Sequence, residues 1–440
     1  MSWPAYAEYR ETDVDWLGPT PSSWSIERMS WLFNDISSGT TPESGNRDFY
    51  DGDINWVTTG ELRERGISQT DKRVTPSALA TYSALKMYPA GALIIAMYGA
   101  TIGRLGWLDA PACTNQACCV FANPKRVSTR FAYYALSAAR EHLILLASGG
   151  GQPNINQDKL RSLRIAVPSS REQVTIAQFL DDETAKIDAL IAKQEQLIAT
   201  LREDRTATIT QAVTEGLDPL VGRKDSGANL VPAIPTSWSC ANLKRLLREP
   251  MTYGANAAAD DDNPDNPRFV RITDIDAGGD LRSETFRSLP PDIAAPYLLD
   301  DGDLLFARSG GTVGKTFLYR SSWGTCCFAG YLVRARVNRD VLSPHFLSYY
   351  AASEPYWQYI SMAQIQATIQ NVSAEKYGSL PVPIPPLDEQ RRIVTHLDRQ
   401  CRDFDALIAK ATDLVSTLVE YRSALITDAV TGKIDVRGAA

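Results

Sequence analysis

The hexapeptide DALIAK occurs twice in this chain, at residues 188–193 and again, without a change, at residues 405–410. The match extends outward, so that about half of the residues from Glu172 to Thr214 recur between residues 389 and 431. In both copies the apolar residues follow heptad-like spacing, which is typical of a long amphipathic helix. The sequence therefore predicts two related helices of about 40 residues, each on the order of 60 Å long.

The repeat also covers the segments ahead of the two helices. PSSWS at residues 21–25 recurs as PTSWS at 235–239, and NINQDKLRSL at 154–163 recurs as NVSAEKYGSL at 371–380. The period of about 215 residues is too long for a solenoid and indicates the tandem duplication of one module. Ahead of each helix, about 150 residues of short apolar runs are separated by Gly, Pro, Asn and Asp, which is typical of an α+β domain. The tryptophan of each PxSWS segment is expected to anchor the core where the chain enters its domain.

The chain order, domain–helix–domain–helix, decides how the two helices meet. A helix of this length is too long to bury its apolar stripe against one domain of about 150 residues, so its near-identical copy is the natural partner. The second helix can run back along the first, and an alternative in which each helix packs on its own domain stays open. We predict an α+β protein in which two globular domains are separated by two long helices that form an antiparallel coiled coil, with an internal pseudo-two-fold repeat.

The repeat also predicts the boundaries of these parts. They are a first domain at residues 1–168, a first spacer helix at 169–216, a second domain at 217–385, and a second spacer helix with a C-terminal tail at 386–440. Ser170 and Gln173 have the spacing of a capping box at the start of the first helix. The predicted helix–helix contacts are Leu180, Ile187, Leu190, Leu197, Leu201, Leu397, Phe404, Leu407, Leu414 and Leu418.

The stretch RSGGTVGKT at residues 308–316 ends as a Walker A phosphate-binding loop does. That loop needs GxxxxGK[ST] between a strand and a helix, but Ser309 stands in place of the first glycine, and the residues that follow are typical of a strand and a turn. The first module carries a copy, GATIGRL at 99–105, in which Leu105 replaces the Ser or Thr that would bind magnesium. We therefore predict a glycine turn between two strands, with one cation beside it, in each module.

Composition and charge narrow the class of protein. A hydrophobic content of 44% and a charged content of 22% are typical of soluble globular proteins, and no apolar run is long enough to span a membrane. The seven cysteines form no CxxC pair and the three histidines are far apart, so we expect reduced cysteines, no metal site and a cytoplasmic location. The net charge is −7, yet residues 20–170 carry 15 Lys and Arg against 12 Asp and Glu, which permits a basic face for DNA.

Taken in order, the motifs of this chain resemble those of the specificity (S) subunits of type I restriction-modification systems. They are DVDWLGPTPSSW at 13–24, SSGTTP at 37–42, INWVTTGEL at 54–62, GALIIAMYGATIGR at 91–104, GDLLFARSGGTVGK at 302–315, PIPPLDEQRRI at 383–393 and AVTGKIDVR at 429–437. The resemblance covers nearly the whole chain and implies a non-catalytic subunit. It implies that each domain reads one half of a bipartite, asymmetric target in double-stranded DNA.

The same resemblance implies the partners. The helical spacer would fix the gap between the two half-sites and dock two methyltransferase (M) subunits, and motor–endonuclease (R) subunits would complete the restriction complex. S-adenosylmethionine, ATP and magnesium would belong to those partners, with no cofactor in this chain and no membrane as a partner.

Contacts with phosphates require Lys or Arg, whereas contacts with base edges require side chains such as Arg, Asn, Gln, Ser or Thr. For each candidate the alternative is a solvated surface charge or a polar loop residue. In the first domain the candidates are Arg63, Arg65, Lys72, Arg73, Tyr98, Arg104, Gln152 and Asn154. In the second domain they are Arg268, Arg271, Arg308, Lys315, Gln364 and Gln366.

Two other functions stay open from the residues alone. The chain could be a nucleoside triphosphatase that uses GGTVGKT, which predicts ATP binding by the isolated chain and its loss in Lys315→Ala. It could also be a coiled-coil adaptor whose two domains bind proteins, which predicts no sequence-dependent DNA binding. The sequence contains no N/D-P-P-Y/F tetrapeptide for adenine methylation and no complete Walker A loop, so it favours the DNA-reading subunit.

Overall fold

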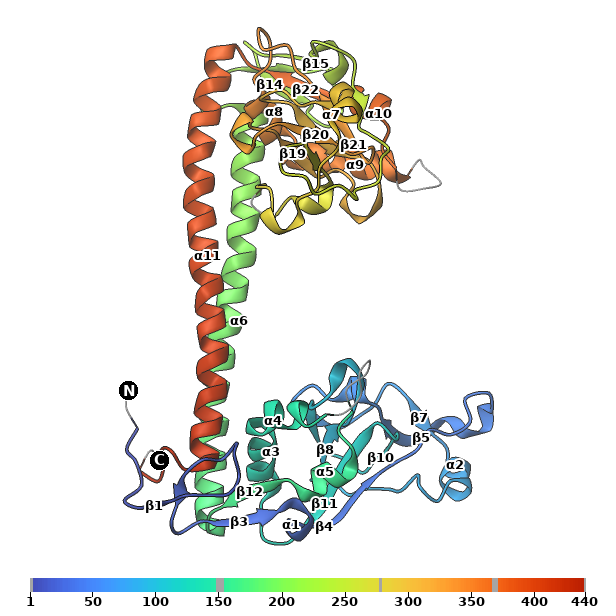
Figure 1. Ribbon diagram of the computed structural model, residues 1–440, viewed down its shortest axis with the longest axis vertical. Coiled ribbons are helices and arrows are strands. Elements are labelled where there is room, and N and C mark those ends of the chain that lie inside the picture. The colour runs from blue at the N-terminus through green and yellow to red at the C-terminus, as the bar shows by residue number, and fades with distance from the viewer. Residues whose placement is uncertain (1–2, 148–153, 277–278, 366–370, 439–440) are drawn as a thin grey trace. The chain divides into compact units, whose positions relative to one another are not determined.

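The computed structural model describes residues 3–147, 154–276, 279–365 and 371–438. The chain divides into two compact units (Figure 1). Unit 1 is formed by Met1–Gln194 with Asp413–Ala440, and unit 2 by Glu195–Thr412. Each unit therefore contains a globular domain and one part of each long helix.

Unit 1 folds around a five-stranded sheet with the order β4-β11-β8-β9-β6. Its central strand β8 is apolar throughout because both faces are covered: Leu93 and Ile95 enter the main core, while Ile94 and Ala96 enter a second core on the other face. The strands of unit 1 are β1 (Tyr9–Arg10), β2 (Thr20–Pro21), β3 (Ser25–Arg28), β4 (Phe33–Ser38), β5 (Tyr50–Val57), β6 (Gly66–Ile67), β7 (Arg73–Val74), β8 (Leu93–Ala96), β9 (Leu105–Leu108), β10 (Cys113–Thr114), β11 (Cys118–Pro124) and β12 (Arg164–Val167). Its shorter helices are α1 (Met29–Leu32), η1 (Arg47–Phe49), η2 (Thr59–Glu61), α2 (Pro76–Thr81), η3 (Gly99–Thr101), α3 (Thr129–Ala138), α4 (Arg140–Leu145) and α5 (Gln157–Ser162).

Unit 2 has the same design around a four-stranded sheet, β16-β21-β18-β19. Leu304 and Phe306 of β18 enter the main core, and Leu305 and Ala307 enter a second core on the opposite face. The strands are β13 (Arg223–Asp225), β14 (Ala233–Pro235), β15 (Ser239–Asn242), β16 (Thr252–Tyr253), β17 (Arg268–Val270), β18 (Leu304–Ala307), β19 (Thr316–Leu318), β20 (Cys326–Phe328), β21 (Leu332–Ala335) and β22 (Pro381–Ile384). The shorter helices are η4 (Leu243–Arg245), η5 (Ile272–Asp274), η6 (Ser283–Thr285), α7 (Pro291–Ala294), η7 (Ala295–Tyr297), η8 (Gly310–Thr312), η9 (Ser321–Trp323), α8 (Pro344–Tyr350), α9 (Glu354–Ile365) and α10 (Ala374–Gly378).

The two PxSWS segments occupy equivalent places. The strand after each segment pairs antiparallel with the strand before a long helix, β3 with β12 and β15 with β22. Trp24 and Trp238 are fully buried, which confirms them as core anchors. Each indole also packs on the glycine that ends a helix of the other module: a Cβ on Gly432 would lie 3.2 Å from Trp24, and one on Gly216 would lie 3.3 Å from Trp238.

The long helices α6 (Ser170–Glu215) and α11 (Leu387–Thr431) run antiparallel within each unit. In unit 1, Asp188 of α6 pairs with Arg422 of α11 at 2.8 Å. In unit 2, Arg205 of α6 pairs with Asp405 of α11 at 3.0 Å. The predicted antiparallel pairing of two long helices is confirmed. Within the described ranges, no helix is long and apolar enough to cross a membrane.

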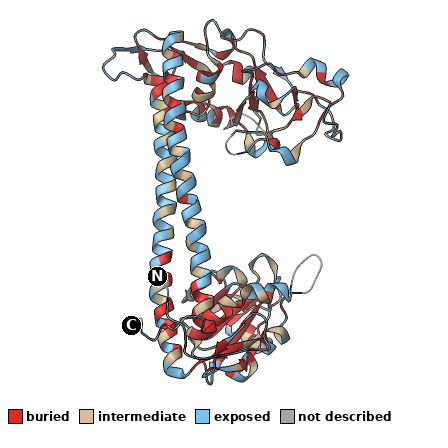
Figure 2. Cartoon of the chain, turned by 60° about the vertical axis from the view of Figure 1, so that its left-hand side comes forward, coloured by how far each residue is buried: buried red, intermediate tan, exposed pale blue. Residues whose placement is uncertain are grey.

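The predicted apolar stripe of the two helices serves two purposes. Leu180 and Ile187 belong to the core of unit 1 and Leu397 to the core of unit 2, so the first turns of each helix do pack on its own domain. Leu201, Phe404 and Leu418 are half-buried, whereas Leu190, Leu197, Leu407 and Leu414 keep 43–50% of their surface exposed. Figure 2 shows the same division, because buried positions gather in the globular domains and at the helix ends. The last four leucines are therefore not the closed seam that their heptad spacing predicted.

A buried glutamine joins each long helix to its own domain. The side chain of Gln173 accepts a hydrogen bond from Ser128 N at 2.8 Å and donates to the carbonyls of Arg126 and Pro168, each at 3.0 Å. Gln173 therefore does not form the predicted capping box with Ser170; the Glu172 backbone N–H instead donates to Ser169 Oγ at 3.4 Å. Because the glutamine amide satisfies loop groups of the domain, it fixes the direction in which the helix leaves.

Candidate nucleic-acid interface

The glycine turn is built in the same way in both units. In unit 1, Gly103 N donates to Ala96 O at 2.8 Å, and in unit 2, Gly314 N donates to Ala307 O at 3.0 Å. Both glycines have positive φ, +75° and +88°, a backbone conformation that other residues adopt only at a cost. A strand follows each turn, β9 in one unit and β19 in the other, so neither turn has the helix N-terminus that a Walker A loop requires. The predicted strand–turn–strand structure is confirmed.

The NIN and NVS segments return to these turns. In unit 1, Tyr98 forms an isolated antiparallel bridge with Asn154, and Ile155 N donates to Met97 O at 2.8 Å. In unit 2, Ser309 forms the same bridge with Asn371. The structure therefore brings together two residues predicted from separate motifs, Tyr98 and Asn154. Asn371 was not among the predicted contacts, although the repeat aligns it with Asn154.

Two exposed tyrosines lie beside the turn of unit 2. The guanidinium of Arg308 lies over the ring of Tyr253, 4.6 Å from its centre, and its Nε donates to Asn371 Oδ1 at 3.4 Å. Tyr253 is 41% exposed, and Tyr331, whose carbonyl accepts from Arg308 N at 3.0 Å, is 69% exposed. Lys315 is exposed on the other side of the turn. A planar cation, an amide and exposed rings together supply donors, an acceptor and stacking surfaces for nucleic acid.

The two exposed tyrosines could not be identified from the sequence. Tyr253 and Tyr331 lie in different parts of the chain and follow no motif or period. Their exposure becomes apparent only when β16 and β21 pair, because that pairing places Tyr253 opposite Val333, close in the chain to Tyr331.

In unit 1 the exposed cations near the turn come from a basic loop, which lies at the opposite edge of the corresponding sheet from these tyrosines. Arg63 and Arg65 are exposed, and the residue between them turns inward. This loop lies beside β9, because Glu64 N donates to Leu105 O at 3.0 Å and Trp107 N donates to Arg65 O at 3.4 Å. It therefore adjoins Arg104, which is also exposed.

The other predicted residues of unit 1 lie apart from this group. Lys72 and Arg73 are exposed but belong to a different sheet, in which β7 pairs with β5. Gln152 lies outside the described residues, as does Gln366 in unit 2.

Two arginines predicted to bind DNA in unit 2 are engaged within the fold. The Arg271 guanidinium donates to both carboxylate oxygens of Asp274, at 3.0 and 2.7 Å, and to Thr285 O at 2.9 Å. Asp274 is buried, so these bonds shape the loop around η5 and hold the Arg271 guanidinium within the fold. Arg268 donates to the carbonyl of Arg282 and lies over the ring of Phe286 at 5.6 Å. Gln364 is half-buried near the end of α9.

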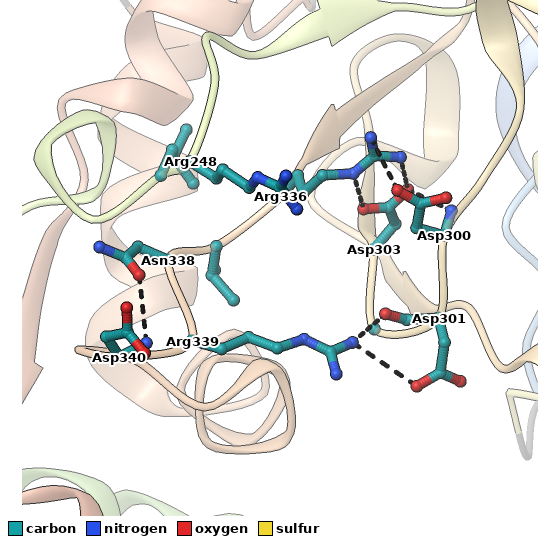
Figure 3. Close-up of a pocket in the computed structure, with 11 residues that line it drawn as sticks. Arg248, Asp300, Asp301, Asp303, Arg336, Asn338, Arg339 and Asp340 are labelled. Atoms are coloured by element: carbon teal, nitrogen blue, oxygen red, sulfur yellow. Dashed lines mark hydrogen bonds and ion pairs between the residues drawn. The ribbon is translucent and has the colours of Figure 1, made fainter.

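A cavity of about 660 Å³ in unit 2 is lined by charges of both signs, which Figure 3 shows paired across it. Arg336 lies 2.7 Å from Asp303, 2.9 Å from Asp300 and 3.2 Å from Glu249. Hydrogen bonding to Asp303 is the main reason why the pKa of Arg336 lies above its usual range. The carboxylates neutralise the guanidinium groups and would repel phosphate, so this cavity is an internal ion-pair network and not part of the interface.

The thiols of both domains are unsuited to nucleophilic chemistry. Burial raises the pKa of Cys113 and Cys119 to about 12, and that of Cys326 to about 11. Thiols with such values remain protonated at neutral pH, and only the thiolate is a strong nucleophile.

The chain is similar to known proteins in both sequence and structure. A family model described as type I restriction modification DNA specificity domain matches residues 21–199 and 277–415. The specificity subunit of the EcoKI enzyme of Escherichia coli is 22% identical, over 95% of this chain and 90% of that protein. The specificity subunit of the MjaIX enzyme of Methanocaldococcus jannaschii is 23% identical, over 69% of each chain.

Two solved structures share the fold. A chain from a study of the assembly and conformational transition of a type I R-M system aligns with a TM-score of 0.73 at 15% identity, covering 94% of this chain and 99% of that one. The HsdS subunit of Thermoanaerobacter tengcongensis aligns with a TM-score of 0.50 at 17% identity, covering 94% and 98% of the two chains.

Proposed function

The chain belongs to the family of type I restriction-modification DNA specificity subunits. On this basis we propose which parts of the chain read DNA and which parts bind the partner subunits. Members of this family are non-catalytic subunits that recognise the DNA target. S-adenosylmethionine and ATP belong to the methyltransferase and motor subunits of such systems and not to the specificity subunit.

Each domain reads one half of a bipartite, asymmetric target in double-stranded DNA. The observation that carries this proposal is the equivalent pair of glycine turns, each bridged to an asparagine but surrounded by different side chains. Unit 1 offers Tyr98, Arg104 and the loop with Arg63 and Arg65, while unit 2 offers Arg308, Lys315 and two exposed tyrosines. A shared scaffold with different contact residues suits two half-sites of different sequence.

The helices α6 and α11 set the spacing between the half-sites and dock two methyltransferase subunits. Leu190, Leu197, Leu407 and Leu414 support this role, because heptad-spaced leucines with 43–50% of their surface exposed offer apolar area to a partner helix. Motor–endonuclease subunits complete the restriction complex, which acts in the cytoplasm. The two recognition domains are residues 1–168 and 217–385. The two spacer helices are residues 169–216 and 386–440, the second with the C-terminal tail.

Co-expression with the methyltransferase subunit of the same system, followed by sequencing that detects methylated adenine, tests this function. The expected result is one bipartite motif, in which two short defined blocks are separated by a fixed run of unspecified bases. Exchange of residues 20–165 for those of a relative should then change only one block. Methylation without such a motif, or no complex with the methyltransferase, would contradict the proposal and favour a protein-binding adaptor.

A further inference from the structure

Glu64 is unusual both in its backbone conformation and in the burial of its carboxylate. Its φ is +55°, in the left-handed region that a residue with a side chain adopts at a cost of about 1–2 kcal/mol. Its side chain is only 34% exposed, and burial raises the pKa of its carboxyl group above the usual range. A glycine would relieve the backbone and a glutamine would relieve the burial of charge, so the contacts of Glu64 must offset both costs.

The inward carboxylate of Glu64 contacts several separate elements of unit 1. Glu64 Oε1 accepts from Leu105 N of β9 at 3.2 Å and lies 3.6 Å from Arg140 of α4. The hydroxyl of Tyr133 on α3 lies 3.5 Å from both the carbonyl oxygen and Oε2 of Glu64. Arg422 of α11 also acts on this carboxylate through its charge.

The charge of Arg422 relates this carboxylate to the pair of long helices. Arg422 is held by Asp188 of α6, with N–O distances of 2.8 and 3.3 Å. Glu64 itself lies between Arg63 and Arg65, and because its side chain turns inward, both arginines are left exposed. Arg63 Nε donates to Gly60 O at 3.2 Å. A change at Glu64 would therefore act on both arginines through the backbone that joins them.

We propose that Glu64 is a positioning residue, which holds the loop at residues 61–66 against β9, α3 and α4 so that Arg63 and Arg65 meet the DNA of the first half-site. This inference rests on the proposed function and deepens it, since it identifies what orients one reading loop. Through Arg422 the loop is coupled to the helix pair on which partner subunits dock.

The coupling should depend on pH. The groups that face the Glu64 carboxylate are Leu105 N, Arg140, Arg422 and the Tyr133 hydroxyl, and they favour its charged form, whereas burial favours the protonated form. As the pH falls through the raised pKa, protonation removes the attraction to the two arginines. Selectivity for the first half-site is then lost as the pH falls through that pKa, while the second half-site is unaffected.

The test compares Glu64→Gln with Asp51→Asn in the assembled methyltransferase complex. Asp51 is a matched control, because it is exposed and also has a left-handed backbone, with φ +59°, so both variants remove one carboxylate at such a position. Binding is measured on DNA with the full target, with the first half-site scrambled and with the second scrambled, from pH 5 to 8. Denaturant unfolding of each variant checks the fold, and Glu64→Gln should be as stable as the unmodified chain or more so.

The expected result is that Glu64→Gln weakens binding to the full target about tenfold, or about 1.4 kcal/mol, and removes the pH dependence. Discrimination should fall for the first half-site only, and Asp51→Asn should match the unmodified chain. Equal behaviour of the two variants, or an equal loss at both half-sites, would overturn the role of Glu64 while leaving the two-reader function intact. An unmodified complex with no preference for either half-site would overturn both.

Discussion

In both modules a single glutamine side chain makes the same hydrogen bonds and joins a long helix to its domain. Gln390 repeats the role of Gln173: its side chain accepts from Ser343 N at 2.7 Å and donates to the carbonyls of Val341 and Pro385 at 2.9 and 2.8 Å. Ser128 and Ser343, the donors to the two glutamines, are themselves the N-cap residues of α3 and α8. Each glutamine therefore locks the start of a long helix to the start of a domain helix.

Replacing Gln173 with Leu should destabilise the chain by about 2–4 kcal/mol, because a buried N–H and two buried carbonyls would lose their partners. Denaturant unfolding measures this loss. Gln178 lies on the same helix and is exposed, so Gln178→Leu is the matched control and should change stability by less than about 0.5 kcal/mol. Equal effects of the two variants would show that the amide contacts of Gln173 do not hold the helix.

The raised pKa values of the buried thiols make stability depend on pH at the alkaline end. Cys113, Cys119 and Cys327 have pKa values of about 12 in the folded chain, against about 8.5 when unfolded, so the unfolded state loses its protons first. Their contribution to stability is complete below about pH 8.5 and is lost progressively as the pH rises toward 12. The denaturant midpoint should therefore fall from pH 8 to pH 10, and a midpoint that rises over this range would contradict the assignment.

At the scale of the element, the two glycines of the turn between β18 and β19 differ in what surrounds them. Gly310 and Gly314 both have positive φ, but a Cβ on Gly310 would meet nothing within 4 Å, whereas one on Gly314 would lie 2.8 Å from Trp357 and 2.9 Å from Ile360. Gly314 is therefore required both by its backbone conformation and by the close packing of α9 against it.

Gly310→Ala should cost about 1–2 kcal/mol, the cost of a left-handed residue, whereas Gly314→Ala should cost more because α9 must also move. Thermal unfolding of the two variants measures the difference. If both cost the same, the contact with α9 does not constrain the turn.

The exposed leucines of α6 and α11 separate pairing of the helices from docking of partners. Leu190→Lys and Leu407→Lys should leave the unfolding free energy within about 1 kcal/mol, because these side chains are already about half exposed. The same variants should weaken the complex with the methyltransferase at least tenfold, since a charge would be buried in an apolar contact. Co-purification measures complex formation, and Lys193→Glu, at an exposed polar position, is the control. Full assembly with both leucine variants would place the docking surface elsewhere.

At the scale of the whole molecule, the register of the helix pair makes the spacing testable. Asp188 pairs with Arg422 and Arg205 pairs with Asp405, so α6 and α11 keep the same antiparallel register at both ion pairs. Residues 195–201 of α6 therefore correspond to residues 409–415 of α11.

Deletion of both heptads should shorten the gap in the recognised sequence, because seven helical residues span about 10 Å, or about three base pairs. Both half-sequences should stay the same, as sequencing of methylated adenine would show. Deletion of residues 195–201 alone should break the pairing and prevent assembly. A double deletion that leaves the gap unchanged would exclude the helices as the element that sets the spacing.

The sequence alone determined the features that repeat, because a duplicated module displays its own pattern twice. The two long antiparallel helices, the α+β domains, the glycine turns and the buried Trp24 and Trp238 all followed from residue spacing and from matches at a fixed offset. Periodicity reports which residues share a face, and it therefore predicts elements well.

Only the tertiary structure decided which residues share a site and which contacts they make. Heptad spacing could not separate the core residue Leu180 from the half-exposed Leu190, since both fit one stripe and differ only in what covers them. Arg271 was expected to contact DNA but pairs with Asp274, and the left-handed backbone of Glu64 follows from no pattern in the sequence. These outcomes depend on the backbone angles that direct each side chain and on what covers it, and residue spacing records neither.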